Sequence, residues 1–133
     1  MGERKYKLIK GLLIDVNNGE TKVIEVEDKL EELYKVLDCD CIDIIQRTIF
    51  GKDYTIVCDD EGLLKGNPKV SALTKGFKPS LVGNLLVVAP GSDDEGNLIG
   101  LNDEEEQYLK KFICNVVDAQ NNRVRKVLVG LNY

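Results

Sequence analysis

Histidine and tryptophan are both absent from the 133 residues of this chain, and no apolar run approaches the ~20 residues of a membrane helix. Without histidine there is no Ser-His-Asp or Cys-His nucleophile, no histidine general base and no histidine metal ligand. The phosphate-binding patterns Gly-x-x-x-x-Gly-Lys-Ser/Thr and Gly-x-Gly-x-x-Gly are missing as well, which argues against an NTPase or a dehydrogenase. We therefore expect a protein that is not an enzyme, with no catalytic residue, no bound metal and no cofactor.

The start of the chain lacks the apolar core and small-residue cleavage site of a signal peptide. We expect a cytoplasmic protein without membrane attachment. Four cysteines, two of them in the pair Cys39 and Cys41, lie among apolar residues, and in a reducing compartment such residues are usually buried free thiols. The pair is also compatible with a metal or redox site, but no second closely spaced pair accompanies it.

The charged residues are unevenly distributed along a chain whose net charge is -5. This balance argues against direct nucleic-acid binding, which requires a basic surface. Ten acids against three lysines lie between Asp15 and Asp43, and seven acids with no base lie between Gly91 and Glu106. By contrast, Leu64 to Val82 carries four lysines and no acid. We expect an acidic side and a local basic patch.

The first half of the chain alternates between strand and helix patterns. Period-2 alternation from Tyr6 to Val16, a turn at Asn17-Asn18-Gly19 and β-branched residues from Thr21 to Val26 predict a hairpin. Apolar residues at helical spacing predict a helix from about Lys29 to Leu37, with Asp28 and Glu31 as a capping box. A second β pair is predicted at Cys41 to Phe50 and Tyr54 to Cys58.

The second half is less regular. One helical turn is expected near Val70 to Thr74, a central strand from Leu81 to Ala89, and a capping box at Asn102 and Glu105. A wide helical stripe continues from Tyr108 to Val117, and an edge strand closes the chain from Arg123 to Leu131. Residues 1–133 are thus expected to form a single α+β domain, with a mainly antiparallel sheet and two helices packed on one face.

The segment Asp59-Asp60-Glu61-Gly62 recurs almost verbatim as Asp93-Asp94-Glu95-Gly96. We interpret both segments as turns, because acidic residues followed by glycine favour turns after strands. The alternative is a divalent-cation or general-acid cluster, and an enzyme would have to use a pair such as Asp59 and Glu61. The calcium-loop spacing of ligands is not met.

The segment Lys65 to Ser80 is the candidate ligand site. Its lysines, hydroxyls, glycines and aromatic ring suit a phosphorylated or ring-bearing ligand. Arg47 and Tyr54 on the preceding β pair supply a planar cation and a second ring if they face the same cavity. The alternative is an ordinary solvated loop with sheet-surface neighbours. The candidate ligand-binding residues are Arg47, Tyr54, Lys65, Lys69, Ser71, Lys75, Phe77 and Lys78.

The stretch Ile42 to Gly83 resembles a small family of domains of unknown function, the one numbered 3846. The residues that carry the resemblance are Ile42-Asp43-Ile44-Ile45, Tyr54 to Leu64, Asn67-Pro68, Ser71-Ala72 and Leu81-Val82-Gly83-Asn84. Such proteins are typical of bacteriophages and bacterial mobile elements, so the resemblance implies an origin and, for a phage-encoded protein, the cytoplasm of the host cell. It implies no catalytic residue.

Two functions follow as hypotheses. The first is a counter-defence protein that binds and sequesters a small nucleotide-like signalling molecule, in a pocket at the interface of a homo-oligomer. The second is an inhibitor that binds a host protein, with acidic faces at Glu25 to Asp43 or Asp93 to Glu106 that imitate nucleic acid. The expected partner is accordingly a small phosphorylated ligand or a host protein.

Overall fold

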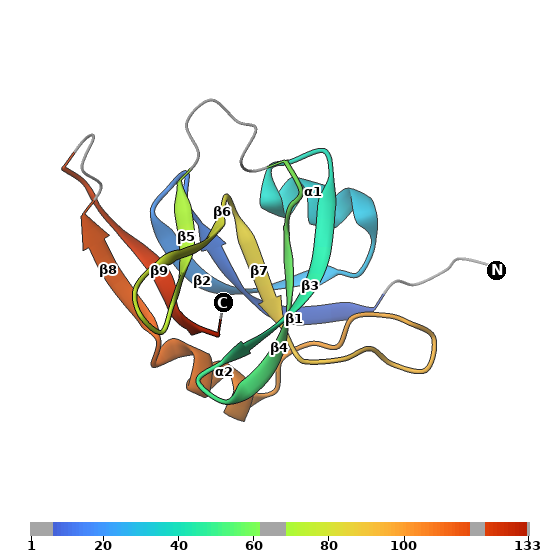
Figure 1. Ribbon diagram of the computed structural model, residues 1–133. Coiled ribbons are helices and arrows are strands. Elements are labelled where there is room, and N and C mark those ends of the chain that lie inside the picture. The colour runs from blue at the N-terminus through green and yellow to red at the C-terminus, as the bar shows by residue number, and fades with distance from the viewer. Residues whose placement is uncertain (1–6, 62–68, 118–121, 133) are drawn as a thin grey trace.

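The computed structural model describes residues 7–61, 69–117 and 122–132, which form nine strands and two helices (Figure 1). The strands are β1 (Leu8–Asp15), β2 (Glu20–Glu27), β3 (Ile42–Ile49), β4 (Lys52–Asp59), β5 (Val70–Thr74), β6 (Pro79–Val82), β7 (Leu85–Val88), β8 (Ile113–Val117) and β9 (Val124–Leu131). The helices are α1 (Leu30–Leu37) and α2 (Asp103–Lys110). Neither helix has the length and apolarity needed to cross a membrane.

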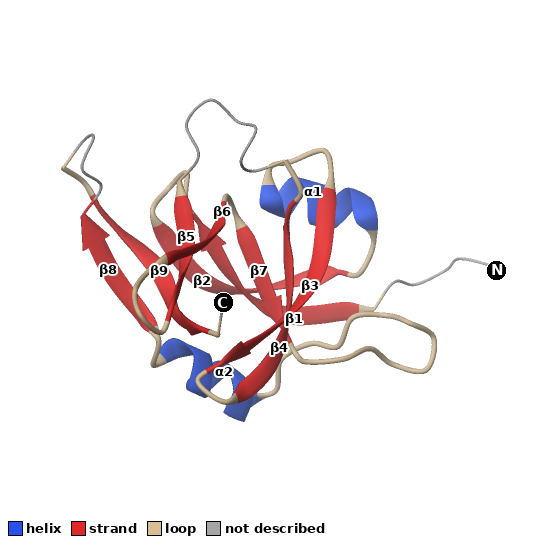
Figure 2. Cartoon of the chain, viewed as in Figure 1, coloured by secondary structure: helices blue, strands red, loops and turns tan. Residues whose placement is uncertain are grey.

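All described strands join one sheet in the order β2-β1-β7-β4-β3-β9-β5-β6, and β8 pairs with β9 outside this path. Every strand pair is antiparallel except β5 with β9, which is parallel. The sheet is therefore mixed, and strand dominates over helix (Figure 2).

The two predicted hairpins are confirmed. In the first, β1 and β2 pair without interruption from Leu8 opposite Glu27 to Asp15 opposite Glu20. The carboxylate of Asp15 accepts the backbone N–H groups of Asn17 and Asn18, which closes the turn. In the second, β3 and β4 pair along their full length. Both hairpins need only local contacts, which is why the sequence pattern predicts them well.

The two helices cover opposite faces of the sheet, so the expectation that both pack on one face is wrong. Buried residues of α1, Leu33 and Leu37, pack with Leu13 of β1. Leu109 of α2 packs with the adjacent Leu12 on the other side. Neighbouring residues of a strand point to opposite faces, and the central strands β1, β4 and β7 are apolar on both. A sheet that is apolar on both faces is stabilised when a helix packs on each face.

The expected strand from Leu81 to Ala89 is divided into β6 and β7. Gly83, with φ 80, and Asn84 separate the two strands. The Asn84 side chain is 5% exposed; its Oδ1 accepts the Val16 N–H at 2.9 Å, and its Nδ2 donates to the Leu37 carbonyl at 3.1 Å. One buried amide therefore joins the ends of β1 and α1 to the start of β7. The helical turn expected at Val70 to Thr74 is likewise wrong, because this segment is β5 and pairs with β6 and β9.

The helix predicted after Asn102 is half as long as expected. Its capping box is confirmed, because the Glu105 N–H donates to Asn102 Oδ1 at 2.8 Å and the Asn102 N–H donates to Glu105 Oε1 at 2.9 Å. The helix ends at Lys110, and Ile113–Val117 forms β8. The capping box predicted at Asp28 is wrong: Asp28 Oδ2 accepts the distant Leu98 N–H instead.

The last strand, β9, is an interior strand and not the predicted edge strand. It pairs with β3, β5 and β8. The sheet also curls, so that the Lys126 N–H of β9 donates to the Gly19 carbonyl in the β1–β2 turn at 3.2 Å. This curvature brings the end of β9 beside the β3–β4 turn and α2 (Figure 1).

Candidate functional site

The predicted ligand-binding segment does not form one loop. Lys65 lies outside the described residues. Lys69 precedes β5 and Lys75 follows it, so the two lysines are separated by roughly 20 Å at ~3.3 Å per residue. Only Lys75, Phe77 and Lys78 stay together, in the exposed β5–β6 turn. There the Phe77 N–H donates to the Thr74 carbonyl, and Phe77 is 67% exposed with φ 64.

Two of the predicted residues are in the core. Ser71 on β5 is 0% exposed. Tyr54 on β4 is 1% exposed and its hydroxyl donates to the Glu105 carbonyl at 3.3 Å. Burial, with the Glu105 carboxylate as a lesser cause, raises the pKa of Tyr54 to about 12. A ligand on the surface of the folded domain reaches neither side chain, so the roles predicted for them are not supported by their positions.

Arg47 lies opposite Tyr54 in the β3–β4 register. Its side chain lines a cavity to which none of the predicted lysines in the described part of the chain contributes. Its Nη1 donates to the Gln46 carbonyl at 2.9 Å. The cavity has a volume of about 390 Å³ and is lined by Gln46, Arg47, Thr48, Asp53, Pro90, Gly91 and Asn132. Arg47 is therefore not brought together with the predicted lysines.

Three rings that were not predicted as site residues form a partly exposed cluster, in which Phe50 is exposed and Tyr108 and Phe112 are half-buried against the core. The Phe50 and Phe112 ring centroids are 4.5 Å apart, and those of Tyr108 and Phe112 are 5.0 Å apart in an edge-to-face arrangement. The Tyr108 hydroxyl donates to the Phe50 carbonyl at 2.6 Å. Such pairs add to the stability gained from burial, because the edge of one ring is attracted to the face of another.

Three lysines surround this cluster. Lys52 Nζ lies 4.7 Å from the Tyr108 ring centroid, and Lys111 Nζ lies 5.6 Å from the same centroid. Lys75 Nζ lies 5.9 Å from the Phe50 ring centroid. These are cation–π distances. We call this set the aromatic–lysine surface, which consists of Phe50, Lys52, Lys75, Tyr108, Lys111 and Phe112.

The aromatic–lysine surface is assembled from three turns. Phe50 and Gly51 form the β3–β4 turn with φ values of 44 and 86, the positive values that a tight two-residue hairpin loop requires. Tyr108, Lys111 and Phe112 come from the end of α2, where the Phe112 N–H donates back to the Leu109 carbonyl. Lys75 starts the β5–β6 turn, and its N–H donates to the Leu131 carbonyl.

A shallow hollow of about 330 Å³ adjoins the Tyr108 side of the surface. It is lined by Lys52, Asp103, Glu104, Gln107, Tyr108 and Lys111. Both charge signs therefore face it. Within the described chain Lys52, Lys75 and Lys111 form no ion pair with a carboxylate, whereas Lys10 and Lys110 both bind Glu106. The surface can thus offer ammonium groups and ring faces to an anionic, ring-bearing molecule.

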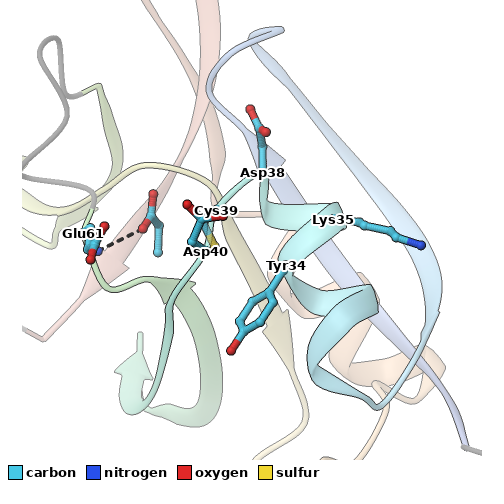
Figure 3. A pocket seen from close by; sticks show the side chains of 7 residues that line it. Tyr34, Lys35, Asp38, Cys39, Asp40 and Glu61 are labelled. Atoms are coloured by element: carbon cyan, nitrogen blue, oxygen red, sulfur yellow. Dashed lines mark hydrogen bonds between the residues drawn. The ribbon is translucent and has the colours of Figure 1, made fainter.

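A second site is an acidic hollow of about 390 Å³ near the end of α1 (Figure 3). It is lined by Tyr34, Lys35, Asp38, Cys39, Asp40, Asp59 and Glu61. The adjacent Cys41 thiol is exposed, and its pKa is raised mainly by the negative charge of Glu61, with burial, Asp60 and Asp40 adding to the effect. The described residues contain no group of three or more cysteines or carboxylates arranged to hold a metal ion.

The described residues of the two repeated acidic segments form turns, as predicted, and Gly62 of the first segment lies outside the described residues. Asp59 Oδ1 accepts the Glu61 N–H at 2.9 Å, and Asp93 Oδ1 accepts the Glu95 N–H at 2.9 Å. Asp93 also accepts the Asn97 N–H, and these backbone bonds lower the pKa of the Asp93 carboxyl. The first aspartate of each repeat thus stabilises its own turn.

The family model described as Domain of unknown function (DUF3846) matches residues 9–113. This chain belongs to the DUF3846 family. The match starts in β1 and ends at the first residue of β8, so it contains the whole aromatic–lysine surface. Searches of curated proteins and of solved structures give no match to this DUF3846 protein.

Five of the six residues of the aromatic–lysine surface in this DUF3846 protein were not predicted as site residues from the sequence. Tyr108 and Phe112 were predicted as part of the apolar stripe of a longer helix. Phe50 was predicted as the last residue of the first strand of the second β pair, but an aromatic residue at the end of a strand does not by itself indicate a site. The spacing of Tyr108 and Phe112, one helical turn apart with lysines at 110 and 111 between them, was the available signal.

Proposed function

We propose that this DUF3846 protein binds a small phosphorylated ligand with a flat ring at the aromatic–lysine surface, and that it does so without catalysis. The observation that carries the proposal is the set of three ammonium groups, on Lys52, Lys75 and Lys111, held around a ring cluster and not paired with carboxylates in the described chain. Lysines attract phosphate, and an accessible ring such as that of Phe50 can stack with a base, so the two together favour a nucleotide-like ligand over a simple anion.

The biological role that fits such binding is sequestration of a nucleotide-like signalling molecule in a host cell. The proposal includes a phage or mobile-element origin, which is what the resemblance of the sequence implies. The exposed Phe77 and Lys78, in the same turn as Lys75, are placed to extend contact with a ligand larger than a mononucleotide. The net charge of -5 disfavours long nucleic acids, whose many phosphates need a broader basic surface.

The test is calorimetric titration with adenine and guanine mononucleotides and cyclic dinucleotides, with inorganic phosphate as a probe for charge alone. The double variant Lys75→Glu and Lys111→Glu should weaken binding of the best nucleotide at least tenfold, because two attractive charges become repulsive. Lys69→Glu, at the far end of β5, is the matched control and should change the affinity little. No binding of any nucleotide, or equal losses in both variants, would contradict the proposal.

A second candidate function uses the acidic hollow as a docking site for a basic surface of a host protein. The carboxylates of Asp38, Asp40, Asp59 and Glu61 around one hollow are the observation that favours it, together with the raised pKa of Cys41, whose main cause is the charge of Glu61. In the other acidic segment the carboxylates of Asp93, Glu105 and Glu106 bind partners within the domain. Biological activity lost in Asp40→Lys but kept in Lys75→Glu would select this function.

A further inference from the structure

The outer edge of β8 is open in the described part of the chain, where β9 is the strand with which it pairs. Figure 1 shows β8 at the margin of the molecule, with β9 on its inner side. An unpaired edge presents a row of N–H and C=O groups to any strand that can align with it. The direction of the backbone groups along this edge, and the residue types of β8, indicate which kind of strand pairs with it.

The backbone groups that point outward can be assigned from the hydrogen bonds of β9. Asn115 lies opposite Lys126, but the Lys126 N–H donates to Gly19 on the opposite side of β9. The pair is therefore of the non-hydrogen-bonded kind, and the N–H and C=O of Asn115 point to the outer edge of β8. The alternation of a strand gives the same direction to the backbone groups of Ile113 and Val117.

This edge lacks the protection that the other edges of the sheet carry. The strand β8 has the sequence Ile-Cys-Asn-Val-Val, without a charged residue. At one end of the sheet, β2 carries glutamates and a lysine; at the other, β6 is four residues long and begins with Pro79. Charges, proline and short length are devices that prevent edge pairing, and β8 has only modest length to limit it.

We propose that β8 pairs in antiparallel fashion with β8 of a second copy of this chain, around a two-fold axis at Asn115. Asn115 then faces Asn115 of the second copy, and the two residues exchange both backbone hydrogen bonds. In this register Val117 faces Ile113 of the second copy. Val117 is 64% exposed, so the pairing covers apolar surface without opposing two like charges. This proposal is independent of the proposed ligand.

The test measures the dimer of the full chain by sedimentation velocity over a wide concentration range. Because one strand pair is smaller than a standard protein interface, we expect a concentration-dependent dimer. Asn115→Pro removes the outward N–H from both copies while leaving the β8–β9 bonds in place, and should raise the dimer Kd by roughly tenfold or more. Asn115→Lys should also raise it, because two lysines then face each other at the axis.

Glu25→Lys on β2 is the control, since it alters the charge of the edge strand at the other end of the sheet and should leave the dimer Kd unchanged. Circular dichroism of each variant verifies that the fold is kept, and Asn115→Lys serves if proline disturbs it. A protein that is monomeric at every concentration, or a dimer with the same Kd in both Asn115 variants, overturns the proposal.

Discussion

Gly130 lies directly against the ring of Phe50: a Cβ added at Gly130 would come within 2.3 Å of the Phe50 Cδ2 and Cε2 atoms. The two residues are also joined by the Phe50 N–H, which donates to the Gly130 carbonyl at 3.1 Å. The backbone of β9 thus supports the ring at the tip of the β3–β4 hairpin. Gly130 adopts φ 114, a conformation that favours glycine.

Gly130→Ala should displace the Phe50 ring and lower the free energy of unfolding by about 2–3 kcal/mol, through steric overlap and backbone strain together. Gly96→Ala is the matched control, because Gly96 also has positive φ, at 82, but has no atom within 4 Å of the added Cβ. Its cost should be about 1 kcal/mol, from strain alone. Urea denaturation measures both. Equal losses of unfolding free energy in the two variants would mean that the contact between Gly130 and Phe50 does not contribute to stability.

Asn84→Ala should lower the free energy of unfolding by about 2–3 kcal/mol, because the variant leaves the Val16 N–H and the Leu37 carbonyl without their partner inside the protein. Asn18→Ala is the comparison: Asn18 is exposed in the β1–β2 turn, where its side chain donates to Asp15. Its effect should stay within about 0.5 kcal/mol. Thermal unfolding followed by circular dichroism distinguishes the two, and a tolerated Asn84→Ala would refute the bridging role.

Ser71→Ala should keep or raise stability, by up to about 1 kcal/mol. The Ser71 hydroxyl is buried and makes no hydrogen bond to the described residues, so it contributes the cost of desolvation without the gain of a bond. Urea denaturation of Ser71→Ala beside the unaltered protein is the measurement. A loss greater than about 1 kcal/mol would show that the hydroxyl has a partner in the folded protein.

Stability should fall on the acid side as Glu106 is protonated. The ammonium of Lys10, and after it that of Lys110, lowers the pKa of Glu106 below the value of 4.5 for a free side chain. A carboxyl whose folded pKa is depressed stabilises the fold above its unfolded pKa, and this stabilisation is lost as the pH falls through the folded pKa. The free energy of unfolding of the Glu106→Gln protein should therefore decline less steeply below about pH 4.5. Urea denaturation at a series of pH values measures this decline.

Glu104→Gln, on the exposed side of the same helix, is the control and should leave the acid-side decline of the unaltered protein in place. Parallel declines in the Glu106→Gln protein and the unaltered protein would mean that the ion pairs of Glu106 do not contribute to the pH dependence. The same titration at high salt should weaken the effect, since these groups lie near the surface.

Local sequence patterns determined the parts of this protein that depend on near neighbours. The β1–β2 and β3–β4 hairpins, the capping box of Asn102 with Glu105, and the turns at Asp59 and Asp93 all form through contacts within a few residues. In each case a side chain or a positive φ residue at the right position stabilises the turn or cap locally.

Pairing between distant segments decided the rest. Ile113–Val117 fits a helical stripe, but its β-branched residues pair with β9, and the helix stops at Lys110. β5 forms for the same reason, between β6 and β9. A periodicity count contains no information on which strand lies beside which, so it also could not assign the two helices to opposite faces or place β9 inside the sheet.

The candidate site shows the same division. The sequence by itself determined that lysines and rings are available, and it identified Lys75, Phe77 and Lys78 as members of one exposed segment. The tertiary structure decided that Lys75 meets Phe50 and that Tyr108 and Phe112 complete the cluster, because these residues come from three turns far apart along the chain. The curvature of the sheet and the position at which α2 ends bring these three turns together. Both depend on packing between residues far apart in the sequence, which local propensity does not specify.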